Sequence, residues 1–232
     1  MKFSATIALG IVFLFGVGHA GDKPDLKDLK DKESYSLGYQ FGQSLKAQGV
    51  DIDLDIYAAG IRDSLGGKEP RMSPEEIRAT VANLRQRVAG VQQKALKEQA
   101  DKNYRDGEDF LVENARKEGV KSLPSGLQYK VLRAGSGRAP KAADTVTVHY
   151  RGTFINGTEF DSSITRGQPQ TFKVDGVIPG WTEALQLMQE GDKWQIFVPA
   201  NLAYGEKGAP PRIPPNSALI FEVELISVQQ SG

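Results

Sequence analysis

Residues 145–163, TVTVHYRGTFINGTEFDSS, predict two antiparallel β-strands joined by a tight turn. Polar and apolar residues alternate in the first half, which is typical of a strand with one buried face. The face expected to be buried carries Val146, Val148 and Tyr150. The pair Asn156-Gly157 follows and is typical of a two-residue hairpin turn. This stretch therefore predicts an antiparallel sheet.

The sequence from Gly119 onward extends the same pattern. Four further runs have the composition of strands, at 127–135, 170–174, 192–200 and 218–228. One short helix is expected among them, near 180–188, because Pro179 fits the first helical position. The inward face of this helix carries Trp181, Leu185 and Met188. The inward face of the last strand carries Leu219, Phe221, Val223 and Leu225. A sheet wrapped on one helix is an α+β domain.

The N-terminal half has a helical pattern instead. Residues 22–33 are charged and lack bulky side chains, so we expect a mobile leader there. Two short helices are predicted between Ser34 and Leu65, where apolar residues recur at helical spacing. They cannot enclose a core by themselves, so we expect them to pack on something else.

A third helix is predicted to begin at the sequence SPEE. Ser73 can cap it, Pro74 fits the first turn, and Glu76 completes a capping box. A heptad pattern follows at Ile77, Val81, Leu84, Val88, Val91 and Ala95. The segment 74–118 is either two helices broken at Gly107 or one solvent-exposed stalk of about 65 Å. The stalk is favoured because no proline interrupts it.

The composition excludes several classes of protein. The 29 basic and 29 acidic residues leave no net charge to attract nucleic acid. The absence of cysteine excludes disulfides, thiol catalysis and lipid attachment through an N-terminal cysteine.

Residues 1–20 combine Lys2, an apolar run and Gly18-His19-Ala20, which predicts a cleaved signal peptide. A membrane anchor is the alternative, but the run is too short. We therefore expect a periplasmic or secreted protein with no membrane span in its mature chain.

The mature chain offers little acid–base or metal chemistry. Its single histidine, His149, alternates with the inward residues and is expected to face solvent. A zinc site and a Ser-His-Asp triad are both disfavoured for that reason. The GSG at 135–137 lacks the Lys-Ser/Thr of a phosphate-binding loop. We expect neither a metal nor a cofactor.

Several motifs together closely resemble the FKBP-type peptidyl-prolyl cis/trans isomerases. They are VTVHYRGTFINGTEFDSS, GVIPGWTEAL and LAYGEKGAPPRIPPNSALIFEVELI, and the resemblance runs from about Leu123 to Val228. Residues 25–118 resemble the dimerisation segment and stalk of the macrophage-infectivity-potentiator type. After the predicted signal peptide (1–20), the resemblance implies an all-α dimerisation segment (21–72), a stalk helix (73–118) and an FKBP-like half-barrel (119–232). It also implies a homodimer through the N-terminal helices.

The resemblance implies an apolar pocket between the sheet and the short helix. Its walls would be Tyr150, Phe160, Phe172, Val177, Ile178, Tyr204, Ile213 and Phe221. Trp181 would form the floor, Asp161 a polar group on the wall, and the Ile178 N–H a donor to a ligand carbonyl. Phe160 and Asp161 can both reach this pocket only if their strand ends or bulges there. Ala209 stands where many members have histidine.

The expected activity is isomerisation of X–Pro bonds during folding of periplasmic or secreted proteins. Its substrates would be proline-containing, unfolded or partly folded polypeptides, and macrolides would be candidate inhibitors. The alternative is a holdase-type chaperone in which the helical part grips unfolded clients and the isomerase pocket is secondary.

Overall fold

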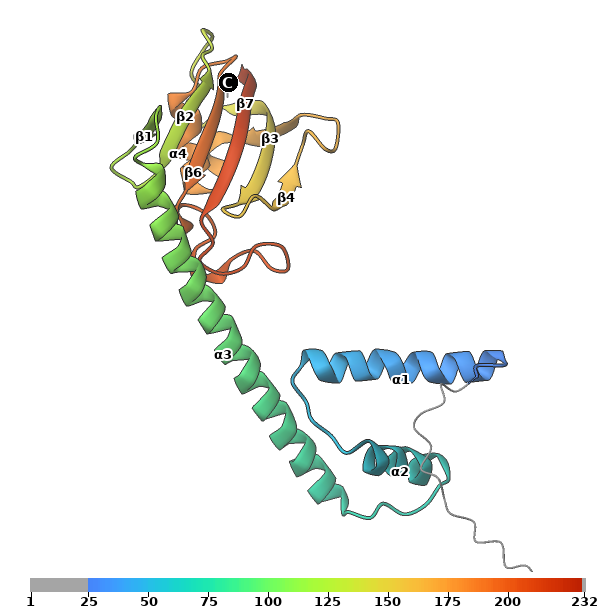
Figure 1. Ribbon diagram of the computed structural model, residues 1–232. Helices are drawn as coiled ribbons and strands as arrows, with labels where there is room; N and C mark the ends of the chain where they lie inside the picture. The colour runs from blue at the N-terminus through green and yellow to red at the C-terminus, as the bar shows by residue number, and fades with distance from the viewer. Residues whose placement is uncertain (1–24, 231–232) are drawn as a thin grey trace, which may run out of the picture. The chain divides into compact units, whose positions relative to one another are not determined.

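The computed structural model describes residues 25–230 (Figure 1). The chain divides into two units, Met1–Pro70 and Arg71–Gly232. The predicted signal peptide, 1–20, lies outside the described residues. None of the helices within 25–230 combines the length and hydropathy needed to cross a membrane.

The first unit contains two helices, α1 (Leu29–Ala47) and α2 (Leu54–Leu65). Each begins after an aspartate cap, and the Asp28 carboxylate accepts a hydrogen bond from the Asp31 N–H at 2.8 Å. The predicted leader 22–33 is therefore wrong from Leu29 on, because a capped helix starts within the charged segment. Neither helix buries a residue, although Phe41 and Tyr57 stack with ring centroids 4.9 Å apart.

The second unit begins with α3 (Pro74–Asn114), an uninterrupted helix of 41 residues and about 60 Å. The predicted capping box is present. The Ser73 N–H donates to the Glu76 carboxylate at 2.8 Å, and the Glu76 N–H donates to the Ser73 hydroxyl at 3.2 Å. Gly107 does not break the helix. A Cβ at this position would lie 3.0 Å from the Cβ of Ala218, so glycine allows the helix to approach that residue closely.

The sheet of the second unit is antiparallel throughout (Figure 1). Its strand order is β1 (Val120–Ser122), β2 (Gln128–Arg133), β6 (Lys193–Val198), β7 (Leu219–Gln229), β3 (Thr145–Phe154) and β4 (Glu159–Ser162). A further strand, β5 (Gln170–Lys173), pairs with the first half of β3. All strands expected from the sequence are present, and only the three-residue β1 was not predicted.

The helix α4 (Pro179–Leu187) packs on this sheet and completes the core. The inward residues expected on β3, α4 and β7 are all buried, which confirms the predicted alternation. Gly180 permits the close approach of α4 to β6, since a Cβ there would lie 2.6 Å from Val198 Cγ1. Three short 3-10 turns lie in the connections, at Val174–Gly176, Ala200–Leu202 and Gly205–Lys207.

The β3–β4 hairpin differs from the expected two-residue turn. The Phe154 N–H donates to the Thr158 carbonyl at 2.9 Å, which leaves three residues, 155–157, in the loop. Of these, only Gly157 has a positive φ, 85°. A two-residue turn of the Asn-Gly kind needs positive φ at both positions, whereas a three-residue loop needs it only at the last. The hairpin is confirmed and its predicted loop length is wrong.

The last turns of α3 pack against the sheet. Asn114 is 1% exposed and its amide donates to the Gln128 side-chain oxygen at 3.0 Å. The Gln128 amide donates in turn to the Leu111 carbonyl at 2.8 Å. The Phe110 ring lies 6.0 Å from that of Phe197. The helix is therefore a stalk where it carries the heptad residues, from Ile77 to Ala95. Its C-terminal end is part of the folded domain.

Candidate functional site

Trp181, at the first turn of α4, lies at the centre of an aromatic cluster. Its ring meets those of Tyr150, Phe221 and Phe172 edge-on, at centroid distances of 5.4, 5.3 and 5.9 Å. These three residues come from β3, β7 and β5. Edge-to-face contacts of this kind hold rings in defined orientations. The Trp181 indole N–H is buried and has no hydrogen-bond partner among the described residues.

Phe160 joins the cluster because β4 bulges. Gly152 pairs with Asp161 and Thr153 pairs with Glu159, which leaves Phe160 as an extra residue. The bulge allows Phe160 and Asp161 to serve the same site, as the sequence required. The Phe160 ring meets that of Phe221 edge-on at 5.6 Å. A Cβ on Gly152 would lie 2.7 Å from the Phe160 ring, so glycine makes room for it.

The polar part of the site is a network of Tyr150, Asp161 and Arg166. The Tyr150 hydroxyl donates to Asp161 Oδ2 at 2.5 Å, and Arg166 donates to Asp161 Oδ1. Arg166 also donates to the Tyr150 oxygen at 2.8 Å, and its guanidinium lies 5.6 Å from the centre of the Tyr150 ring. Sequence reasoning missed Arg166, because it lies in an irregular turn whose residues follow no period.

The network keeps Asp161 ionised. Burial raises the pKa of the Asp161 carboxyl, but hydrogen bonds from Tyr150 and Arg166 outweigh burial and leave this pKa below its ordinary value. The pKa of Tyr150 is raised, first by burial and then by its hydrogen bond to Asp161. Burial and the nearby Asp161 charge also raise the pKa of Tyr204, which is 40% exposed. Asp161 therefore acts electrostatically on both tyrosines.

Val177 and Ile178 precede α4 and pack against the core around Trp181. The Ile178 carbonyl accepts from the N–H groups of Trp181 and Thr182, at 2.9 and 3.1 Å. The Thr182 hydroxyl donates to the Val174 carbonyl at 2.7 Å and holds the start of the helix. Among the described residues, the Ile178 N–H has no hydrogen-bond acceptor. It is therefore free to donate to the carbonyl group of a ligand.

The long loop before β7 contributes Ile213, which is buried in the same core as Trp181. Ala209 and Ile213 form an isolated β-bridge, with the Ala209 N–H donating at 2.8 Å and the Ile213 N–H donating at 3.0 Å. The peptide bond between Pro210 and Pro211 is cis. The bridge positions Ile213, while the Ala209 methyl group adds only apolar contact.

The ten residues carried over from the family motifs therefore gather at one place. Eight belong to the core around Trp181 or pack against it, Asp161 hydrogen-bonds Tyr150, and Tyr204 lies within the influence of the Asp161 charge. His149 lies on the other face of β3. It is half-buried there, and its Nδ1 lies 3.1 Å from the Ser163 hydroxyl. No cluster of three or more metal-ligating side chains is found within residues 25–230.

Comparison with known proteins accounts for both parts of the chain. Residues 136–226 match the family described as FKBP-type peptidyl-prolyl cis-trans isomerase, and residues 30–131 match the domain amino terminal to it. The chain is 42% identical over 232 residues to the "Outer membrane protein MIP" of Legionella longbeachae, covering 100% of this chain and 99% of that protein. It is 47% identical over 205 residues to the "Peptidyl-prolyl cis-trans isomerase Mip" of Coxiella burnetii, covering 88% and 89%.

Among solved structures, FkpA from Escherichia coli has the same fold. It is 41% identical, with a TM-score of 0.74, and the alignment covers 90% of this chain and 100% of that one. The helical N-terminal segment and the antiparallel sheet with its single helix thus occur together in a known relative. The chain belongs to the FKBP-type peptidyl-prolyl cis-trans isomerases, and the enzyme class expected from its motifs is confirmed.

Proposed function

We propose that this enzyme is exported and accelerates X–Pro isomerisation in periplasmic or secreted polypeptides as they fold. Rotation about an X–Pro amide meets a barrier of about 18–20 kcal/mol, because planarity is stabilised by resonance. The twisted amide loses that resonance and its carbonyl becomes less polar. An apolar site therefore binds it better than the planar amide, and each 1.36 kcal/mol of this preference is worth about tenfold in rate.

The residues of the site contribute in different ways to the preferential binding of the twisted amide. Trp181 forms the floor for the proline ring, and the rings of Phe160, Phe172 and Phe221 exclude water around it. The Ile178 N–H binds a substrate carbonyl. Tyr204 orients the substrate, and ionised Asp161 provides an electrostatic contribution as the amide twists. No acid, base or nucleophile is needed, because no bond is broken.

The observation that supports this assignment best is the ring arrangement around Trp181, and a second tryptophan supplies the control. Trp194 is 6% exposed against 5% for Trp181, and its buried indole N–H likewise has no hydrogen-bond partner among the described residues. Its ring stacks on Tyr129 and not on the rings around Trp181. In an X–Pro peptide isomerisation assay, Trp181→Phe should lower kcat/KM and Trp194→Phe should leave it unchanged. Equal effects of the two variants would overturn the assignment. A macrolide added to the wild type should inhibit.

Export rests on residues 1–20, and it can be tested directly. We expect the secreted or periplasmic protein to begin near Gly21. Mass spectrometry of the N-terminal peptide from that fraction measures the cleavage site. Recovery of the uncleaved chain from the membrane would favour the anchor instead.

We also propose that the chain forms a homodimer through its N-terminal helices. Large apolar side chains of α1 and α2 are exposed in the single chain, among them Leu37, Leu54 and Ile56 at 70, 70 and 67%. The heptad residues Ile77, Val81 and Val91 of α3 are exposed as well. Exposed apolar surface of this extent typically marks an interface. Analytical ultracentrifugation should give twice the chain mass, and a monomer mass would exclude the dimer.

The same exposed surface is compatible with the alternative, holdase activity. A fragment beginning at Arg71 separates the two activities and retains the turns of α3 that cover Gln128. A fragment beginning at residue 119 would remove Leu111 and Asn114 from the fold. We expect the fragment from Arg71 to keep peptide isomerisation. If this fragment also suppresses aggregation as fully as the whole chain, the N-terminal helices are not responsible for holdase activity.

A further inference from the structure

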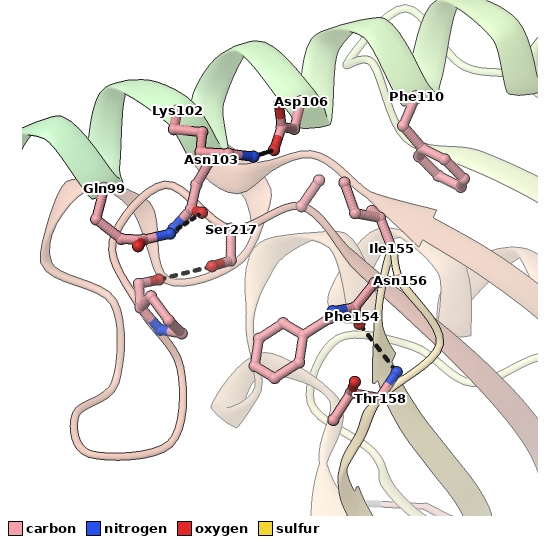
Figure 2. Close-up of a pocket in the computed structure, with 12 residues that line it drawn as sticks. Gln99, Lys102, Asn103, Asp106, Phe110, Phe154, Ile155, Asn156, Thr158 and Ser217 are labelled. Carbon is pink, nitrogen blue, oxygen red and sulfur yellow. Dashed lines mark hydrogen bonds and ion pairs between the residues drawn. The ribbon is translucent and has the colours of Figure 1, made fainter.

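A concave site lies between α3 and the β3–β4 hairpin (Figure 2). It is a cavity of about 580 Å³, within the range of about 300–1,000 Å³ typical of ligand sites. Apolar groups from three segments line it: Phe110 of α3, Phe154 and Ile155 of the hairpin, and Pro214 and Ala218 before β7. None of the ten residues around Trp181 is among its lining residues.

The walls of this cavity are held in place by contacts within the second unit. The Asn103 side-chain amide donates to the Pro215 carbonyl at 2.8 Å, which ties α3 to the loop before β7. The Ser217 hydroxyl donates to the Pro214 carbonyl at 2.8 Å. Gly107 brings the helix against Ala218. A ligand would therefore bind a preformed site without ordering it, which favours affinity.

Four of the polar side chains that line the cavity pair with one another. Lys102 forms an ion pair with Asp106, one turn along α3 (Figure 2). The Gln99 amide donates to the Asn103 oxygen at 2.8 Å. The two charged side chains of the lining are paired with each other. Five apolar side chains lie beside the uncharged polar residues Asn156, Thr158 and Ser217. An uncharged, apolar side chain suits this site better than a charged one.

A chain of ring contacts links the wall of the cavity to Trp181. The Phe154 ring lines the cavity and lies 5.1 Å from Phe160, which is 5.6 Å from Phe221, itself 5.3 Å from Trp181. Trp181 and Phe154 are therefore at most about 16 Å apart. An extended polypeptide spans this distance with at most about five residues, at roughly 3.3 Å per residue.

We propose that the cavity binds an apolar side chain of the client polypeptide, within about five residues of the proline at Trp181. This inference rests on the proposed function, because it places the proline on Trp181. The occupant is an extended segment of an unfolded client. The site thereby favours prolines that have a large apolar residue nearby, as exposed core segments of unfolded proteins do. Because the contact is made equally by planar and twisted amide, it lowers KM and leaves kcat unchanged.

The test uses the full mature chain and uncharged peptides with one proline. Phe or Ser is placed three, four or five residues before the proline in one set of pairs, and at the same distances after it in another. Isomerisation is measured by exchange NMR, which needs no protease. Burial of one aromatic side chain is worth about tenfold in affinity. We expect Phe to lower KM about tenfold relative to Ser in one pair, with equal kcat.

Two cavity-filling variants identify where this selectivity arises. Gln99→Trp fills the cavity from α3 and Thr158→Trp fills it from the hairpin, whereas Lys97→Trp places the same side chain on an exposed part of α3 outside the lining. The first two should abolish the Phe advantage and keep turnover of the Ser peptides, and Lys97→Trp should retain both.

The outcomes separate this inference from the proposed function. Wild-type turnover of all peptides with equal KM would overturn the cavity site alone. Persistence of the Phe advantage in both filled variants would also overturn it. A changed oligomer mass in Gln99→Trp, without any peptide selectivity in the wild type, would assign the cavity to a second copy of the chain instead. Absence of turnover for every peptide would overturn the proposed function itself.

Discussion

Gly152→Ala should impair the isomerase by moving two rings of the site. Gly152 lies in β3, where its backbone has ordinary strand geometry, so alanine introduces no backbone strain. The added methyl carbon would lie 2.7 Å from Phe160 Cζ and 2.9 Å from Phe221 Cε1. The perturbation is therefore one carbon atom placed between two aromatic residues that surround the proposed proline site.

The size of the effect follows from these distances. Carbon atoms pack best at about 3.5–4.0 Å, so one or both rings must withdraw by about 1 Å. Overpacking of this kind costs about 1–3 kcal/mol of folding stability. The Phe221 ring contacts Trp181 and the Phe160 ring contacts Phe154, which limits where they can go. If about 1.4 kcal/mol of the cost is lost from transition-state binding, kcat/KM falls tenfold.

The assays are X–Pro peptide isomerisation and denaturant unfolding, with Gly90→Ala as the control. A Cβ on Gly90, in the exposed part of α3, would have no other atom of residues 25–230 within 4 Å, the helix's own backbone aside. That variant should keep wild-type kcat/KM and gain about 0.5–1 kcal/mol of stability from helix propensity. If Gly152→Ala has the same kcat/KM and the same unfolding free energy as the wild type, the added methyl group does not displace the rings and the reasoning is refuted.

Three other contacts of the second unit can be tested by substitution. Trp181→Ala should cost about 3–5 kcal/mol of unfolding free energy, because it leaves a cavity under the aromatic cluster; a loss below 1 kcal/mol by denaturant titration would contradict its central position. Because the pKa of Asp161 is lowered in the fold, its ionised form contributes stability above its ordinary pKa of about 3.9, and this contribution is lost as the pH falls through the lowered value. The difference in unfolding free energy between the wild type and Asp161→Asn should therefore be constant from about pH 7 to 5 and shrink below about pH 4, and a difference that grows on acidification would contradict this sign. Ser73→Ala removes the helix cap and should cost about 0.5–2 kcal/mol, whereas Ser73→Asp should restore most of it, as followed by thermal unfolding monitored by circular dichroism.

The regular elements were predictable because their side chains repeat with the period of the backbone. Alternation correctly placed Val146, Val148 and Tyr150 inside, and the capping box located the start of α3. The start of α1 was missed, because Asp28 is a cap within a charged run whose composition alone is typical of a mobile segment. The strand β1 was missed because three residues show no period.

The site was predictable where it depends on motifs and unpredictable where it depends on the fold. Family motifs named ten residues that the structure brings together, and the bulge at Phe160 was anticipated because Asp161 had to reach the same side. Arg166 was not found, because only the turn after β4 brings it to Asp161. The role of Gly107 was equally hidden, since its partner Ala218 lies more than a hundred positions away.

The contact between Gly107 and Ala218 has a consequence for how this sequence can evolve. With 3.0 Å available for a Cβ at position 107, the two side chains share a volume that holds little more than one methyl group. Enlargement of either residue must be matched by reduction of the other, or the helix separates from the loop and the hydrogen bond between Asn103 and Pro215 is lost. Positions 107 and 218 should therefore change together among descendants of this chain. The smaller residue can stand at either position, provided that the larger one stands at the other.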